Sequence, residues 1–202
     1  MRIAVSACLL GEASRYDGRS KPSARVSELA ALGHELVPVC PEVAGGLPTP
    51  RTPCEIVRAP WMKSGKARTA DSSTPSFLVS ETNREKKECL GEAGRGYGSF
   101  TSCEREASTA DEDSWTILDA SGADRTATYA LGAQTELARA KEAGCELAIL
   151  KAKSPSCGSG EVYDGTFSGT LVPGWGIAAA TFRDAGITVI DETADFSRLS
   201  RM

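Results

Sequence analysis

The sequence lacks the features that mark several common protein classes. Its 202 residues contain no apolar run long enough to span a bilayer, which disfavours an integral membrane protein. The net charge is −4 and no basic run occurs, so neither nucleic acid nor an anionic membrane surface is an expected partner. No G-x-x-x-x-G-K-[ST] phosphate-binding loop is present. The remaining class is an ordinary globular protein, with 41% hydrophobic and 25% charged residues.

Histidine and close cysteine pairs are also scarce. The single histidine, His34, falls between a predicted helix and a predicted strand, where we expect a surface residue. A Cys–His nucleophilic pair is therefore disfavoured. Seven cysteines are present, but no two of them form the C-x-x-C spacing that is usual in structural zinc sites. Their odd number prevents complete disulfide pairing within one chain.

The stretch VSAC at residues 5–8 resembles the cleavage site of a bacterial lipoprotein. A secretory signal needs a basic and an apolar region before such a site, and only four residues precede this one. We therefore interpret MRIAVSACLL as a strand that enters a loop, and we expect a cytoplasmic protein. In that reducing compartment the cysteines are free thiols, ligands of a metal or cofactor, or a nucleophile.

A repeated pattern predicts the fold class. Three segments place a glycine just before a short apolar run: LGHELVPV (32–39), AGCELAIL (143–150) and AGITVI (185–190). Glycine suits the end of a helix, and unbroken Val, Ile and Leu runs are typical of strands buried on both faces. With RIAVSA (2–7) as a first strand, helices and strands alternate. This alternation predicts an α/β, Rossmann-like layered fold with a mostly parallel sheet.

A long polar insertion interrupts this pattern at about residues 62–115. Its composition is charge-mixed and poor in branched apolar residues, and it shows no clear period. Such a segment is either a surface insertion that buries little or a lid over a site. We expect a single domain over residues 1–202 that carries this insertion.

Three cysteines follow predicted strands: Cys8 after the first, Cys40 after the second and Cys157 in the loop after the third. Ligands bind beyond the carboxyl ends of parallel strands, so these thiols are expected to meet at one edge of the sheet. Soft thiolates select zinc or iron–sulfur clusters. A cluster held by three cysteines would leave one iron without a protein ligand, and that iron could act as a Lewis acid.

The other cysteines fit this arrangement less well. Cys145 precedes its strand and is expected at the opposite edge, while Cys89 and Cys103 fall in the insertion. Only Cys54, which follows GGLPTPR, is a plausible fourth member of the group. For any one of these cysteines the alternative is a small buried apolar side chain.

Four motifs resemble the bacterial 2-thiouracil desulfurase family, also known as the domain-of-unknown-function 523 family. They cover most of the chain outside the insertion, and the longer ones hold several Cys, Gly and Pro positions. The motifs are VSACLLGEASRYDGRSK (5–21), VPVCPEVAGGLPTPRTPCEI (37–56), LAILKAKSPSCGSGEVYDGTFSGTLVPGWGI (147–177) and AGITVI (185–190).

The resemblance implies a Rossmann-like α/β domain that carries a [4Fe-4S] cluster on three cysteines, which map onto Cys8, Cys40 and Cys157. It also implies an enzyme that removes sulfur from thiouracil without net redox change. In that reaction the open iron takes the thiocarbonyl sulfur, water replaces it on carbon, and hydrosulfide leaves. The expected partner is a small thiopyrimidine or a related thiocarbonyl compound.

The resemblance also implies catalytic roles for Glu42 and Ser154. Glu42 would be the acid/base that moves protons between water and the pyrimidine; otherwise it is a surface carboxylate or a charge at a helix start. Ser154 is favoured over Ser156 as the hydroxyl that donates to the ring or to a cluster sulfur, unless both only shape a turn. Ser156 is retained as a candidate substrate-binding residue.

Four more residues are candidates for substrate binding. Gly45 and Gly46 let the backbone approach a ligand closely. Tyr16 and Asp17 would position a substrate, or form a structural turn.

Two alternative functions stay open on the sequence. One is an iron–sulfur cluster-binding or redox-sensing module without turnover, and the other is a zinc-stabilised small-molecule binder.

The insertion separates the PCEI region from DASGADRTATYALGA. The resemblance implies that family members join these two regions directly. The presence of the insertion allows a substrate other than thiouracil itself.

Overall fold

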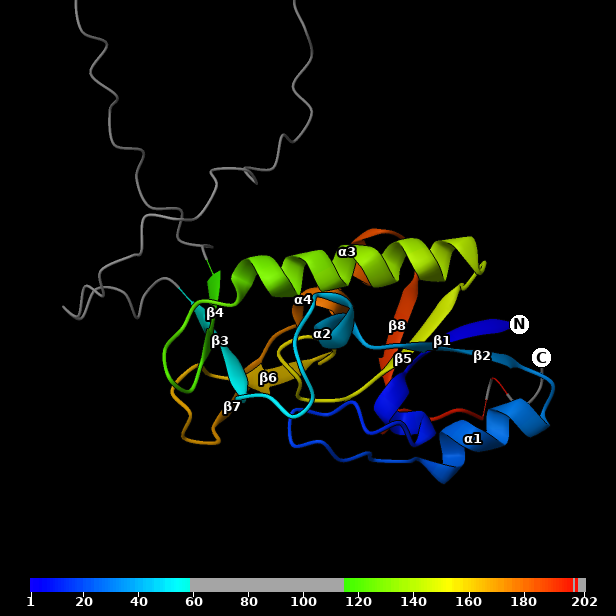
Figure 1. Ribbon diagram of the computed structural model, residues 1–202. Coiled ribbons are helices and arrows are strands. Elements are labelled where there is room, and N and C mark those ends of the chain that lie inside the picture. The colour runs from blue at the N-terminus through cyan, green and yellow to red at the C-terminus, as the bar shows by residue number, and fades with distance from the viewer. Residues whose placement is uncertain (59–114, 198, 200–202) are drawn as a thin grey trace, which may run out of the picture. The chain divides into compact units, whose positions relative to one another are not determined.

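The computed structural model describes residues 1–58, 115–197 and 199 (Figure 1). The predicted insertion at about 62–115 lies outside these residues, apart from Trp115. The single-domain organisation over residues 1–202 therefore stays a prediction. Among the helices that the structure describes, none combines the length and the apolar character needed to cross a bilayer.

Strands and helices alternate along the described chain. In order, the elements are β1 (Arg2–Ser6), the 3₁₀ helix η1 (Ala7–Leu10), α1 (Ala24–Ala31), β2 (Glu35–Val39), α2 (Pro41–Ala44), β3 (Cys54–Arg58), β4 (Trp115–Asp119), α3 (Thr126–Glu142), β5 (Leu147–Leu150), β6 (Glu161–Tyr163), β7 (Leu171–Pro173), α4 (Ile177–Asp184) and β8 (Thr188–Asp191).

The central element is a four-stranded parallel sheet in the order β2-β1-β5-β8. These are the four strands predicted from the apolar runs, so the α/β prediction is confirmed. The sheet places Ala4 of β1 between Val37 of β2 and Ala148 of β5. Two antiparallel pairs, β3–β4 and β6–β7, form separate two-stranded sheets.

Helices cover both faces of the parallel sheet. Along β1, Ile3 and Val5 pack in the cluster that contains α1, while Ala4 packs in the cluster that contains α3 and α4. Figure 1 shows α3 and α4 on one side of the sheet and α1 on the other. Because successive side chains of a strand point to opposite faces, a strand between two helical layers must be apolar at every position.

Local features mark both ends of α3. The side chain of Asp124 accepts a hydrogen bond from the backbone N–H of Thr126 at 2.8 Å. The helix ends before Gly144, which has a φ of +70°, a conformation that glycine adopts without steric cost.

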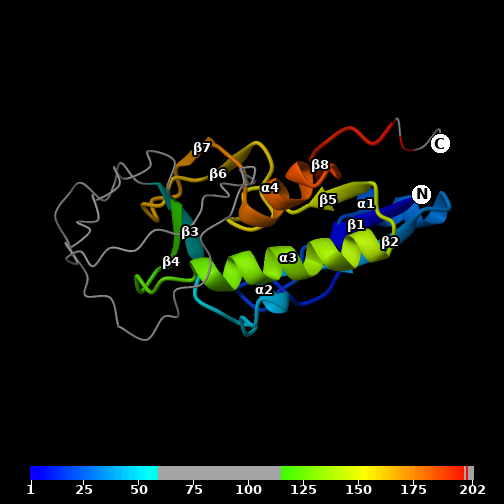
Figure 2. The same ribbon diagram turned by 90° about the horizontal axis from the view of Figure 1, so that it is seen from above.

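Glycines bring α2 and α3 into close contact, and the two helices lie side by side in Figure 2. A Cβ atom on Gly132 would overlap the carbonyl oxygen of Pro41, and one on Gly45 would overlap the carbonyl oxygen of Thr128. The contact is therefore made backbone to backbone. Because α2 begins directly after Cys40, this packing fixes the position of that residue.

The prediction that His34 lies on the surface is wrong, since only 7% of the residue is exposed. Its Nε2 donates to the carbonyl oxygen of Leu199 at 3.1 Å, and its Nδ1 lies 3.4 Å from the amino nitrogen of Met1. The C-terminal segment covers the histidine through a contact between residues 165 positions apart, which no local pattern reveals.

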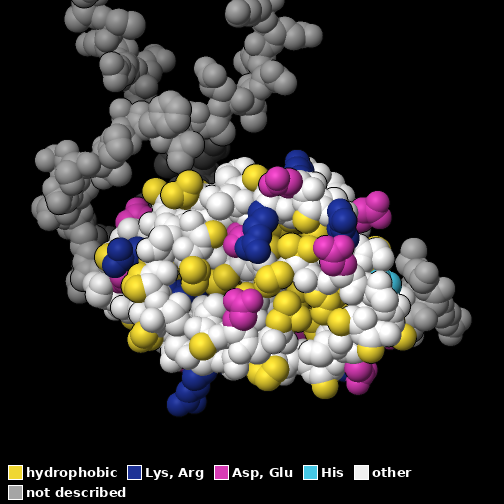
Figure 3. Space-filling model, turned by 45° about the vertical axis from the view of Figure 1, so that its right-hand side comes forward, with side chains coloured by type: hydrophobic (Ala, Val, Ile, Leu, Met, Phe, Trp, Pro, Cys, Tyr) yellow, Lys and Arg dark blue, Asp and Glu magenta, His cyan; other side chains and the backbone are white. Residues whose placement is uncertain are grey.

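Charged side chains of both signs are interspersed on the face shown in Figure 3, with hydrophobic side chains between them. The described part of this face carries no extended field of one sign.

Candidate active site

A pocket of about 600 Å³ lies at the carboxyl edge of the parallel sheet. Cys8, Cys40 and Cys157 all line it, and each follows a strand: β1, β2 and β5 respectively. The structure thus brings together the three cysteines that the strand order predicted at one edge. Cys145 is buried just before β5 and does not line the pocket, also as predicted.

Burial dominates the electrostatics of these thiols. It raises the pKa of Cys8 to about 11, and the neighbouring Cys40 adds to this rise, while Lys151 and Arg15 oppose it. Burial also raises the pKa of Cys40 and of Cys157. The neighbouring Cys8 and Cys40 raise the pKa of Cys157 further. Without iron the thiols are therefore neutral at pH 7, so a metal that binds here displaces protons.

Two contacts position Cys40. Its backbone N–H donates to the Oε1 atom of Glu136 on α3 at 3.1 Å, and its Sγ donates to the carbonyl oxygen of Ser14 at 3.9 Å. Glu136 is buried, and its Oε2 atom forms an ion pair with Nη1 of Arg139 at 3.7 Å. Sequence reasoning missed Glu136, because nothing in a helical pattern shows which of its polar residues faces inward.

The candidate donor set of the pocket consists of three cysteine thiols. Among the described residues, no three His, Cys, Asp or Glu side chains are grouped so that they could hold one metal ion. In an iron–sulfur cluster each cysteine binds a different iron, so the three sulfur atoms need not converge on one point. The soft thiol donors of the pocket are of the type that binds iron–sulfur clusters.

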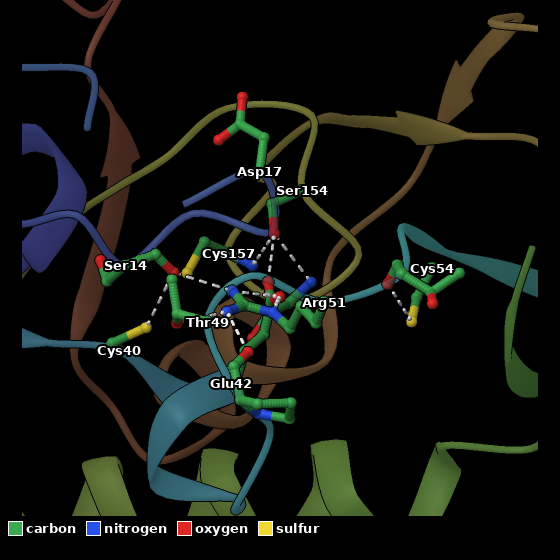
Figure 4. Close-up of polar contacts among 12 residues, drawn as sticks. Ser14, Asp17, Cys40, Glu42, Thr49, Arg51, Cys54, Ser154 and Cys157 are labelled. Carbon is green, nitrogen blue, oxygen red and sulfur yellow. Dashed lines mark hydrogen bonds and ion pairs between the residues drawn. The ribbon is translucent and has the colours of Figure 1, made fainter. Parts of the chain in front are cut away.

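Cys54 also lines the pocket but has different neighbours. Burial raises its pKa, and the groups that act on it include Tyr129 and Glu42 rather than the three cysteines. Its Sγ donates to the carbonyl oxygen of Thr52 at 3.6 Å. Figure 4 shows Cys54 well apart from Cys40 and Cys157. Cys54 is therefore not grouped with the three cysteines that follow strands of the parallel sheet.

Glu42 lies in the first turn of α2 and forms an ion pair with Arg51 inside the pocket (Figure 4). The Nε and Nη2 atoms of Arg51 each lie 2.7 Å from Oε2 of Glu42. The Arg51 side chain is only 5% exposed, and its remaining N–H groups donate to Ser14, Pro48 and Thr49. The guanidinium is held from several sides and in turn fixes the carboxylate, with Oε1 left on the side of Ser154.

The two serines next to Pro155 have different positions. Ser154 lines the pocket, and its Oγ accepts the backbone N–H groups of Ser156 and Cys157 at 3.1 and 3.2 Å. Its own O–H donates to Oε1 of Glu42 at 3.4 Å. Ser156 is fully buried and does not line the pocket; its carbonyl oxygen accepts N–H groups at the start of α4. Of the two hydroxyls, Ser154 is the one that faces the site.

The predicted substrate-binding residues are placed in different ways. Tyr16 lines the pocket and is 44% exposed. Asp17 pairs with Arg15 at 3.1 Å, and Figure 4 shows its carboxylate turned away from Glu42. Gly45 and Gly46 do not line the pocket, and Gly45 packs against α3 instead. The geometry therefore favours Tyr16 alone among these four.

The chain is similar to known proteins. The 2-thiouracil desulfurase family matches residues 3–96 and 99–194. The chain belongs to the 2-thiouracil desulfurase family.

Two relatives support this assignment. The uncharacterized protein YbbK of Bacillus subtilis (strain 168) is 34% identical over 190 residues, which cover 94% of this chain and 95% of that protein. The solved structure of the [4Fe-4S]-dependent thiouracil desulfidase TudS is similar with a TM-score of 0.62 and 33% identity, over 95% of this chain and 91% of that one. The resemblance and the fold class inferred from the sequence are thereby confirmed.

The sequence analysis missed one further charged group of this member of the desulfurase family. Glu192, directly after β8, pairs with Lys151 at 3.1 Å and with Lys21 at 3.5 Å. It also accepts the backbone N–H of Ala152 at 2.7 Å. Lys151 and Lys21 line the pocket. The strand-end rule that selected the cysteines could have found Glu192, because it follows the fourth strand of the same sheet.

Proposed function

We propose that this protein converts a thiolated pyrimidine of the thiouracil type to its oxo form and releases hydrosulfide, without net redox change. The observation that carries the proposal is a single pocket in which three cysteine thiols lie beside Glu42 and Ser154. Membership of the 2-thiouracil desulfurase family and the similarity to TudS support it.

Cys8, Cys40 and Cys157 would hold a [4Fe-4S] cluster in this pocket. The resulting open iron would supply Lewis acidity toward the substrate sulfur, because three cysteines leave one of four irons without a protein ligand. Lys151 and Arg15 place positive charge near Cys8. These charges offset part of the negative charge that three thiolates bring to a buried site.

Glu42 is the proposed acid/base. The overall reaction exchanges a C=S group for C=O, consumes one water and releases sulfide with the protons of that water. Oε1 of Glu42, on the side away from Arg51, would take a proton from the attacking water. The ion pair with Arg51 leaves this oxygen in a defined direction, so the carboxylate need not reorient during the reaction.

Ser154 is the proposed hydrogen-bond donor. Its oxygen already accepts two backbone N–H groups, so its O–H is the part of the side chain left for an incoming molecule. Its distance of 3.4 Å from Glu42 indicates a weak hydrogen bond in the resting protein, which a ring oxygen or nitrogen of the substrate can replace.

Anaerobic reconstitution with iron and sulfide tests the proposal. The reconstituted protein should release hydrosulfide from at least one thiopyrimidine, and Glu42→Gln should retain the iron but lose turnover by roughly a hundredfold or more. Iron and acid-labile sulfide without any hydrosulfide release would instead support a cluster-binding module. Bound zinc without sulfide would contradict the cluster.

A further inference from the structure

An exposed phenylalanine lines the pocket at the turn between β6 and β7. Phe167 is 41% exposed and has a φ of +57°. The left-handed region is disfavoured for bulky residues, and such strain costs on the order of 1 kcal/mol or more at one residue. The surrounding structure must therefore hold this turn in place.

A buried carboxylate provides that hold. Glu55 of β3 is 8% exposed, and its Oε2 accepts the backbone N–H groups of Gly165 at 3.0 Å and of Phe167 at 2.9 Å. Gly165 approaches β3 so closely that a Cβ atom there would lie 2.7 Å from the carbonyl oxygen of Ile56. Glu55 and this close approach together fix the direction in which Phe167 leaves the turn.

The held aromatic ring has no role in the described core. Phe167 belongs to none of the clusters of buried side chains in the described part of the chain. Its ring also has no cationic partner there, whereas the ring of Tyr16, the other exposed aromatic of the pocket, lies 5.8 Å from the guanidinium carbon of Arg15. A strained backbone and a buried carboxylate thus serve to present an unused aromatic surface at the pocket.

We propose that Phe167 is a specificity-determining residue, whose ring packs against the face of a planar heteroaromatic substrate, and that Glu55 is its positioning residue. The inference rests on the proposed function and narrows the substrate class to planar aromatic rings. Thiocarbonyl compounds without a planar ring would lack this contact. Stacking of a base on an aromatic side chain changes binding by roughly 5- to 150-fold.

Substitutions at Phe167 separate stacking from apolar contact. Phe167→Leu keeps an apolar side chain at the same left-handed backbone position but has no π surface. It should raise the KM for 2-thiouracil about tenfold. The kcat should stay within about threefold, since the contact is made equally in the ground state and the transition state. Phe167→Tyr should retain the wild-type KM. Leu131→Ala, at an exposed apolar position outside the pocket, is the matched control and should change neither constant.

A double-mutant cycle tests the role of Glu55. Glu55→Ala should raise KM in the same direction as Phe167→Leu, and the double variant should be no worse than Phe167→Leu alone. Additive effects would contradict a positioning role. If Glu55→Ala does not fold, Glu55→Gln gives the same comparison with weakened acceptance of the two N–H groups.

Failure of this inference is distinguishable from failure of the proposed function. If the wild type releases hydrosulfide and Phe167→Leu has the same KM as the wild type, the stacking role is wrong while the function stands. If no thiopyrimidine is turned over, the function is wrong. In that case equilibrium dialysis with 2-thiouracil and uracil still decides the inference: weaker binding by Phe167→Leu supports it, and equal binding overturns it.

Discussion

The pocket has two walls that are built in different ways. One wall is the carboxyl edge of the parallel sheet, where strands hydrogen-bonded to one another and covered by helices present Cys8, Cys40 and Cys157. The other wall comes from the antiparallel pairs β3–β4 and β6–β7, where Glu55 and Phe167 lie. The first wall is fixed by the two core clusters on the faces of the parallel sheet. The second has a smaller core cluster of its own, and side-chain hydrogen bonds from Glu55 hold its turn at Phe167.

This difference places the proposed cluster ligands on one wall and the residues proposed to contact the substrate ring on the other. The residues proposed to hold the cluster follow strands of the parallel sheet, which cannot shift without repacking the core. The metal site should therefore tolerate changes in the antiparallel pairs β3–β4 and β6–β7. The second wall can vary in sequence and shape while the parallel sheet stays intact, since loops on a rigid scaffold accept substitutions. Substrate choice within such a family is therefore expected to reside in the second wall.

The largest expected effect compares two cysteines at opposite edges of the parallel sheet. Cys40→Ala should abolish both bound iron and hydrosulfide release, because Cys40 is a proposed ligand at the pocket edge. Cys145→Ala removes a buried thiol at the opposite edge and should leave both unchanged. Iron, acid-labile sulfide and hydrosulfide are measured after anaerobic reconstitution. Full turnover by Cys40→Ala would refute the proposed ligand set.

The next effect concerns the ion pair between Glu42 and Arg51. Arg51→Met leaves the carboxylate of Glu42 largely buried without its partner and should cost about 3–5 kcal/mol of unfolding free energy. Urea unfolding measures this loss. Adding Glu42→Gln to Arg51→Met should restore part of the stability, because the uncompensated charge is then removed. Equal stability of the wild type and Arg51→Met would show that the pair contributes nothing to the fold.

A smaller effect tests how tightly α2 is held beside the sheet. Gly132→Ala would normally favour a helix by about 1 kcal/mol, but here the added Cβ meets the backbone of Pro41. We expect a net loss of up to about 3 kcal/mol, with a fall in turnover because α2 carries Glu42. Gln134→Ala, at an exposed position of the same helix, is the control. A thermal transition unchanged by Gly132→Ala would mean that the two helices can separate freely.

The smallest effect is a pH dependence at the end of β4, which pairs with β3. Desolvation raises the pKa of Asp119, but hydrogen bonds from Ser121, Ala123 and Arg125 outweigh it and lower this pKa from 3.8 to about 2. The stabilisation, at most about 2 kcal/mol, is complete above pH 4 and is lost as the pH falls through 2. The stability difference between the wild type and Asp119→Asn should therefore shrink between pH 4 and pH 2. A difference that stays constant over this range would rule out the linkage.

Much of the sheet wall could be predicted from local patterns. Glycines such as Gly33, Gly144 and Gly186 precede the apolar runs that become β2, β5 and β8, and all three have positive φ values. Once the strands are parallel, residues that follow them must share an edge. The meeting of Cys8, Cys40 and Cys157 follows from strand order alone, without knowledge of any side-chain contact.

The second wall and the polar contacts inside the pocket could not be predicted in this way. The pairing of Glu42 with Arg51, the choice of Ser154 over Ser156, and the hold of Glu55 on Phe167 depend on the directions of side chains in turns, which have no period. The contacts of Ser154 with Glu42 and of Phe167 with Glu55 join residues 112 positions apart, and Arg51 reaches Glu42 across a loop that has no regular period. The sequence by itself therefore determined the layered fold, the family and the edge at which the thiols gather, because strand periodicity and chain order carry that information. Only the tertiary structure decided which oxygens and which ring face the pocket, because those directions are set by packing between segments.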